Sequence, residues 1–182
     1  MDKGGWYYNM ATIISGSSGG TAVTTATQKI LQVVQSVKTD TASVGGATFA
    51  DVGLSASITP SSSSSKILVQ VQASTGSTVG YSMKTRLMRG STAIHIGDAA
   101  GNRPRASTEN TGIYASTSNL SSFPVSIIFL DSPSTTSAVT YKVQYASYGT
   151  NTVYINRTGS DSNTSEYDAR TASSITLMEV AS

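Results

Sequence analysis

The sequence has no cysteine, a single histidine and few charges, and each shortage excludes a class of function. Without cysteine the chain can form no disulfide, no thiolate metal site and no cysteine nucleophile. Only 12% of its 182 residues are charged, which is about half of the share usual in globular proteins. A formal net charge of +2 gives no dense basic stripe of the kind that binds nucleic acid, so no nucleic-acid partner is expected.

Long apolar runs are missing as well. The opening MDKGGWYYNMATIISGSSGG contains no continuous apolar stretch of signal-peptide length. No segment approaches the ~18 apolar residues that span a membrane. We therefore expect a soluble protein that is made in a cytoplasm and has no membrane partner.

Small hydroxyl residues take the place of charges: the chain contains 32 Ser and 25 Thr. Such a polar but uncharged surface suits a protein that packs side by side with others, because buried interfaces are depleted in charged residues.

Most of the chain alternates between apolar and polar residues with a period of two. KILVQVQAS, for example, places Ile67, Val69, Val71 and Ala73 on one face, as in a half-buried strand. About nine such strands at short spacing predict an all-β, antiparallel sandwich over residues 28–182. The expected strands are 29–38, 52–60, 66–74, 82–90, 92–98, 123–131, 137–147, 152–156 and 173–180.

The serine run in ITPSSSSSKILVQVQ could be a linker between two domains or a loop within one. Alternating strands of similar length flank it, and neither side has enough strands for its own core. Pro60 should end the first strand, since proline cannot donate to a sheet. We interpret the run as a hairpin loop inside one sandwich.

Residues 1–27 have a different composition, which is rich in Gly, Ser, Thr and Ala. We expect them to form an extended N-terminal arm. The arm also carries apolar residues that could order on a partner, although a poorly ordered terminus is the alternative. These candidate contact residues of the arm are Trp6, Tyr7, Tyr8, Ile13 and Ile14.

Nothing in the sequence makes a positive case for an enzyme, a metal site or a cofactor. The only histidine, His95, is expected to be an exposed strand residue, and a Ser-His-Asp triad would need it. DSNTSEYD at 161–168 resembles the start of a calcium-binding EF-hand loop, but it has Glu166 where glycine is required. A glycoside hydrolase would need a carboxylate pair. The nearby candidates, all in expected loops, are Glu109, Asp161, Glu166 and Asp168.

One group of basic residues is a candidate contact patch for an acidic surface, with an ordinary charged sheet face as the alternative. It consists of Lys84, Arg86, Arg89, Arg103 and Arg105. The nine tyrosines could serve a protein interface or a sugar site, because tyrosine pairs an apolar ring with a polar tip.

Several segments resemble a β-domain of virion structural proteins of tailed bacteriophages, especially marine and cyanobacterial ones. They are GLSASITPSSSSSKILVQVQAS, LMRGSTAIHIGD, FLDSPSTTSAVTYKVQYAS, VYIN and SSITLMEV, within about residues 50–180. The resemblance implies a virion component, a jelly-roll-like β-sandwich that forms a homotrimer. It carries no catalytic motif. The segment VSIIFL, apolar on both faces, agrees with a strand that meets its own core and a neighbouring subunit.

The first function expected is therefore a non-enzymatic decoration (cement) protein on the capsid exterior, which binds the major capsid protein and other virion proteins. The chain has an arm but no coiled-coil heptads or repeats for a fibre stem. The alternative is the receptor-binding tip of a head or tail fibre that holds a host glycan.

Overall fold

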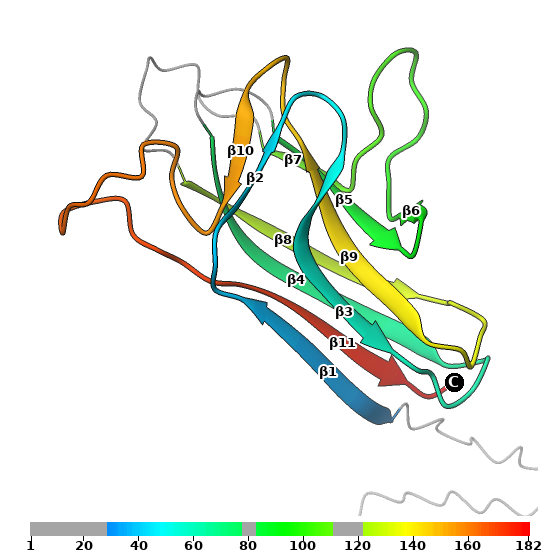
Figure 1. Ribbon diagram of the computed structural model, residues 1–182. Helices are drawn as coiled ribbons and strands as arrows, with labels where there is room; N and C mark the ends of the chain where they lie inside the picture. Colours follow the sequence, from blue (N-terminus) through cyan, green and yellow to red (C-terminus); the bar gives the residue numbers. More distant parts are fainter. Residues whose placement is uncertain (1–28, 78–82, 111–121) are drawn as a thin grey trace, which may run out of the picture.

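The computed structural model describes residues 29–77, 83–110 and 122–182 (Figure 1). These residues form eleven strands and no helix. Within these ranges no helix has the length and apolarity needed to cross a membrane. The strands are β1 (Ile30–Lys38), β2 (Ala42–Gly45), β3 (Ala50–Ile58), β4 (Lys66–Ser77), β5 (Met83–Arg89), β6 (Thr92–Ile94), β7 (Thr108–Asn110), β8 (Ser122–Asp131), β9 (Val139–Ala146), β10 (Thr152–Ile155) and β11 (Ser173–Val180).

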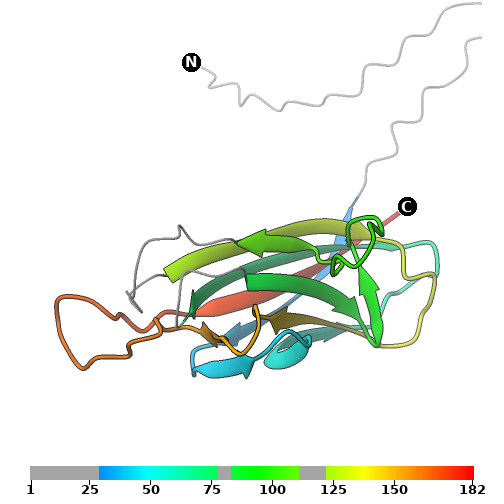
Figure 2. The same cartoon turned by 90° about the horizontal axis from the view of Figure 1, so that it is seen from above.

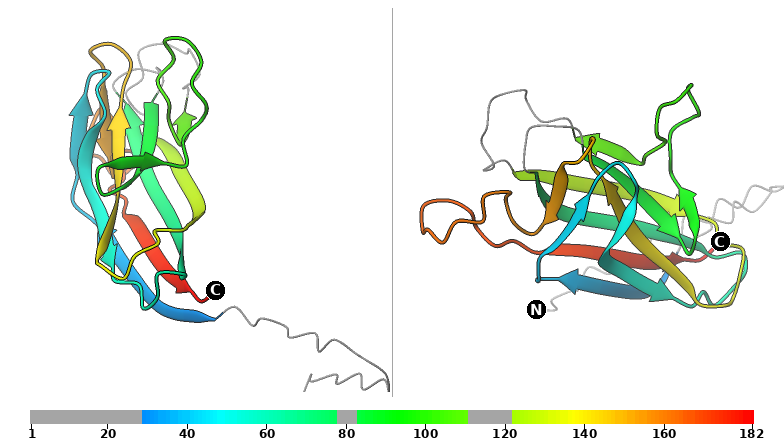
Figure 3. Two further views of the ribbon diagram at one scale, coloured as in Figure 1. Left: turned by 90° about the vertical axis from the view of Figure 1, so that its right-hand side faces the viewer. Right: turned by 45° about the horizontal axis from the view of Figure 1, so that its top comes forward.

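The strands pair in two antiparallel sheets that lie face to face as two layers (Figures 2 and 3). In sheet A, β4 pairs with β8 along one edge. Along its other edge β4 pairs first with β11 and then with the short β10. β1 and β2 extend the sheet beyond β11 and β10. Sheet B has the order β3-β9-β5, and β6 and β7 share the outer edge of β5.

The chain passes from one sheet to the other between most successive long strands. The principal orders are β1-β11-β4-β8 in sheet A and β3-β9-β5 followed by β6 and β7 in sheet B. This arrangement is that of a jelly roll, in which two four-stranded sheets are built from interleaved Greek keys. The predicted all-β, jelly-roll-like sandwich is confirmed.

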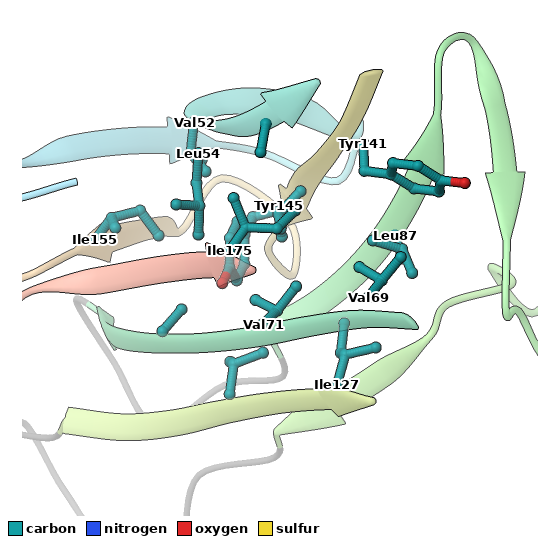
Figure 4. Packing of buried hydrophobic residues seen from close by; sticks show 14 of the residues in the cluster. Val52, Leu54, Val69, Val71, Leu87, Ile127, Tyr141, Tyr145, Ile155 and Ile175 are labelled. Carbon is teal, nitrogen blue, oxygen red and sulfur yellow. The ribbon is translucent and has the colours of Figure 1, made fainter. Parts of the chain in front are cut away.

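The core lies between the sheets and is filled by the alternate residues that the sequence pattern predicts (Figure 4). Ile67, Val69 and Val71 of β4 face Tyr141 and Val143 of β9, and all five side chains are fully buried. Burial of each such side chain contributes roughly 1.5–3 kcal/mol before the entropic cost of folding.

Three features of the strands differ from the sequence prediction. β2 and β7, of four and three residues, are too short to show a clear alternation. The strand expected over 92–98 ends at Ile94. His95 follows with a φ of 50°, a left-handed conformation that a strand cannot contain.

The serine run lies inside the sandwich domain, as expected, but the prediction of a hairpin is wrong. β3 belongs to sheet B and β4 to sheet A, so the loop between them crosses from one layer to the other. β3 ends at Ile58, two residues before Pro60. The loop instead packs against the end of β11, where it surrounds a buried carboxylate.

That carboxylate belongs to Glu179, which is fully buried on the inner face of β11. Its Oε1 accepts hydrogen bonds from the Ser61 amide at 2.7 Å and the Ser61 hydroxyl at 2.6 Å. Its Oε2 accepts one from Gln32 Nε2 of β1 at 2.6 Å. Burial acts to raise the pKa of Glu179, but the hydrogen bonds from Gln32, Ser61 and Ser65 outweigh it and lower the pKa to about 2. Glu179 therefore ties the crossover loop to sheet A as an ionised group.

We expect Glu179→Gln to lower the free energy of unfolding at neutral pH by about 1–3 kcal/mol, because an amide turns a donor toward groups that also donate. A lowered native pKa stabilises the fold above the ordinary pKa of 4.5, and this stabilisation is lost as the pH falls toward 2. The difference between wild type and variant should therefore shrink over that range in urea titrations. Glu166→Gln, at an exposed loop position, is the matched control. A difference that stays constant from pH 7 to pH 2 would contradict this role.

Candidate interaction surfaces

His95 lies just beyond β6 with its side chain exposed. Its ring is 4.8 Å from the ring of Phe129 on β8. This stacking bridges the edge of sheet B and the edge of sheet A. The contact gives His95 a packing role at the margin of the sandwich.

The carboxylates of the loop from β10 to β11 are engaged by groups of the protein itself. Asp161 forms ion pairs with Arg170 and, at 3.5 Å, with Arg157. The hydrogen bond from Arg170 is the main reason that the pKa of Asp161 is lowered. Asp168 accepts hydrogen bonds from the hydroxyls of Thr158 and Ser160. Among the described residues, no group of three or more His, Asp or Glu is placed to hold a metal ion.

Three of the five basic candidates lie close together at β5. Lys84 and Arg86 project outward from β5, where Lys84 Nζ lies 3.9 Å from Glu109. The Arg86 guanidinium stacks 3.8 Å from the centre of the Phe49 ring, and its Nε donates to the Arg105 carbonyl at 2.7 Å. Arg103 and Arg105 belong to the exposed loop between β6 and β7. The structure thus brings Lys84, Arg86 and Arg105 together at β5, whereas Arg103 donates to the Ala100 carbonyl of its own loop at 3.4 Å.

Arg89 lies on the opposite face of β5 from Lys84 and Arg86. Its Nη1 is 3.0 Å from both carboxylate oxygens of Asp131, which is buried at the end of β8. The hydroxyl of Tyr141 donates to the same carboxylate at 2.6 Å. Burial and the neighbouring Asp131 carboxylate raise the pKa of Tyr141. Arg89 therefore joins sheet B to sheet A and stands apart from the other four basic residues.

The apolar segment VSIIFL in β8 does present two different faces. Val125 and Ile127 point into the core and are 2% and 3% exposed. Ile128 and Leu130 point outward from sheet A and are 60% and 43% exposed. Large apolar side chains therefore lie on both faces of this strand, and those on the outer side are exposed.

The opposite edge of sheet A repeats this arrangement, which the sequence reasoning missed. Leu31, Val33 and Val37 point outward from β1 and are 46%, 56% and 56% exposed. The signal was present in KILQVVQSVK, where apolar residues occupy both phases of the alternation. We call the outward side of β1, β11, β4 and β8 the outer face of sheet A.

The arm candidates Trp6, Tyr7, Tyr8, Ile13 and Ile14 lie outside the residues that the structure describes. Comparison of the chain with protein-family models found no match, and comparison with curated proteins found none either. The surfaces described above are therefore interpreted from their own chemistry.

We expect Arg89→Met to lower the free energy of unfolding by about 3–5 kcal/mol, because it leaves the buried Asp131 carboxylate without its counter-ion. Arg103→Met, at an exposed loop position, should change stability by less than about 0.5 kcal/mol. Urea unfolding of both variants provides the measurement. Equal stabilities would show that Arg89 does not bridge the two sheets.

Proposed function

We propose that this chain is a non-enzymatic structural protein of a bacteriophage virion. On the capsid exterior it would decorate and brace the lattice of the major capsid protein as a homotrimer. The observation that carries this proposal is the apolar outer face of sheet A. An exposed apolar sheet face of this extent marks a protein that functions in contact with another surface.

The jelly-roll fold supports the proposal as an analogy, since viral capsid and lectin domains use it repeatedly. The segments that resemble phage virion proteins supply the polar anchors of this fold. FLDSPSTTSAVTYKVQYAS holds Asp131 and Tyr141, and SSITLMEV holds Glu179. The same segments also hold Leu68, Leu130 and Met178, which lie on the outer face of sheet A.

The position of the chain ends also favours attachment through the arm. The Ala181 amide donates to the Lys29 carbonyl at 2.9 Å, so the start of β1 lies beside the end of β11 (Figure 1). The loops β9–β10 and β10–β11 lie at the opposite end of the sandwich. An arm bound to a capsid would leave those loops directed away from it.

Those distal loops support the second candidate function, a receptor-binding tip of a head or tail fibre. Tyr148 and Tyr167 lie in them and are 59% and 49% exposed. Exposed tyrosines can stack on sugar rings and hydrogen-bond their hydroxyls. A host glycan is the ligand that this alternative requires.

Copy number separates the two functions. We expect quantitative mass spectrometry of purified particles to find this chain in hundreds of copies, in a fixed ratio to the major capsid protein. A receptor-binding tip would be present in only a few copies. A low number, or absence from the particles, would overturn the decoration function.

We expect a chain that begins at residue 28 to keep the same β content by circular dichroism and to lose binding to empty capsids. Each apolar arm residue that is buried in a partner contributes roughly 1.5–3 kcal/mol before the arm is ordered. Several arms on one oligomer multiply this effect through avidity. A chain that begins at Met10, which keeps Ile13 and Ile14 and removes the three aromatic residues, separates the two halves of the arm. If the chain from residue 28 binds as well as the full chain, the patch around Arg86 and Arg103 becomes the candidate contact.

A further inference from the structure

The outer face of sheet A contains a continuous apolar row that crosses four strands. Strand register aligns Val33 of β1 with Met178 of β11, Met178 with Leu68 of β4, and Leu68 with Leu130 of β8. Adjacent strands lie about 4.8 Å apart, so each side chain in the row is within reach of the next one. The row is a feature of the folded sheet, because its members are far apart in the sequence.

More apolar residues flank the row. Beside the row, toward the start of β1, Ile30 is aligned with Val180 of β11. The next row toward the distal loops contains Gln35, Thr176, Gln70 and Ile128. Gln35 donates to Thr176 at 2.9 Å. Apart from Ile128, this second row is polar but uncharged, and part of its hydrogen-bonding capacity is already satisfied within the sheet.

Charge is nearly absent from this face. In the four strands, all of which the structure describes, Lys66 is the one charged residue that points outward. The outer face of sheet B is different, because Lys84, Arg86, Lys142 and Asp51 all lie on it. A neutral face avoids like-charge repulsion when two identical copies meet.

The size of the face fits a stable contact between subunits. β4 and β8 pair from Ile67 to Gly76, a length of about 33 Å at ~3.4 Å per residue, and four strands are about 15–20 Å wide. The projected area is thus on the order of 600 Å², and side chains increase the accessible area. A standard interface buries ~800 Å² on each partner.

From these observations we propose that copies of this chain associate through the outer face of sheet A, with the row Val33–Met178–Leu68–Leu130 at the centre of the contact. The inference rests on the proposed function in that it names the surface behind the proposed homotrimer. A second copy is the occupant that this neutral and apolar face fits, because it offers the same neutral chemistry in return.

The first test places charge on the face. Val33 and Ile128 are 56% and 60% exposed in the single chain, so Val33→Glu/Ile128→Glu should fold normally. Desolvation of an unpaired carboxylate should raise the dissociation constant of the oligomer by roughly 100-fold or more. Ser55→Glu/Thr140→Glu places the same charges at exposed positions of the outer face of sheet B and is the matched control. Sedimentation at micromolar concentration should find the control assembled like the wild type and the sheet A variant monomeric.

The second test uses the lack of cysteine in the chain. Gln70 of β4 and Gln144 of β9 are both half-buried, outward-facing residues of central strands, so Gln70→Cys and Gln144→Cys form a matched pair. In the assembled protein, maleimide should label Gln70→Cys at least tenfold more slowly than Gln144→Cys. Adding Val33→Glu and Ile128→Glu to the Gln70→Cys protein should restore fast labelling.

Three results would overturn the inference. One is an oligomer in which both cysteines react equally fast, since the contact would then lie elsewhere. Another is a wild-type monomer in which both cysteines react equally fast. The third is a monomer in which Gln70→Cys is protected until residues 1–27 are removed, since the occupant would then be the arm of the same chain. The proposed decoration function is tested separately, by the copy number in particles. If the chain self-associates through sheet A but is absent from particles, only the function is refuted. If the chain is monomeric but present in hundreds of copies, only this contact is refuted.

Discussion

The side-chain amide of Asn156 holds together three segments of sheet A that are distant in the sequence. Its Nδ2 donates to the carbonyls of Lys38 and Asp40 at 2.8 and 2.9 Å, and its Oδ1 accepts from the Ser173 hydroxyl at 2.6 Å. The residue is fully buried with a φ of 62°, a conformation that asparagine tolerates better than most residues. It fixes where β1 ends, where β10 ends and where β11 begins. The continuity of sheet A, and of its outer face, depends on this junction.

The two sheets differ in their outer sides: sheet A is apolar on both of its sides, whereas sheet B is apolar only on its inner side. The inner side of sheet A is covered by sheet B, and its outer side presents Val33, Leu68, Ile128 and Leu130. The outer side of sheet B is instead covered by ion pairs such as Lys142–Asp51, at 2.7 Å. A molecule that met only water would gain nothing from this difference. The asymmetry is explained when one side of the sandwich belongs to an interface and the other to solvent.

Much of this fold could be predicted from period-two alternation, because each long strand buries every second residue. The short β2 and β7 could not be predicted, nor could the partners of each strand, since register depends on contacts between distant segments. Buried polar residues were the other omission. Glu179 lies on the same side of β11 as Ile175 and Leu177, so the alternation of the sequence points its side chain inward. A carboxylate is expected at a buried position only when its hydrogen-bond donors are known, and these donors lie in distant segments. Arg89 was likewise assigned to a surface patch because its partner, Asp131, lies 42 residues away. The outward apolar residues of β1 were missed because the pattern of KILQVVQSVK predicts a strand without showing which residues face the core.

The two proposed contacts, the outer face of sheet A and the arm, together restrict the symmetry of the assembly. β1 begins at one end of the sandwich, where it continues the chain from residue 29, and the strands of sheet A run along the length of the molecule (Figures 1 and 3). A twofold axis perpendicular to those strands would send the arms of two copies in opposite directions, so that one capsid surface could bind only one of them. A rotation axis parallel to the strands sends every arm to the same end. Only this second, cyclic arrangement lets all arms contribute to binding at once, and the proposed trimer is one arrangement of this kind. It also gathers the distal loops of all subunits at the far end, where Tyr148 and Tyr167 would face the medium.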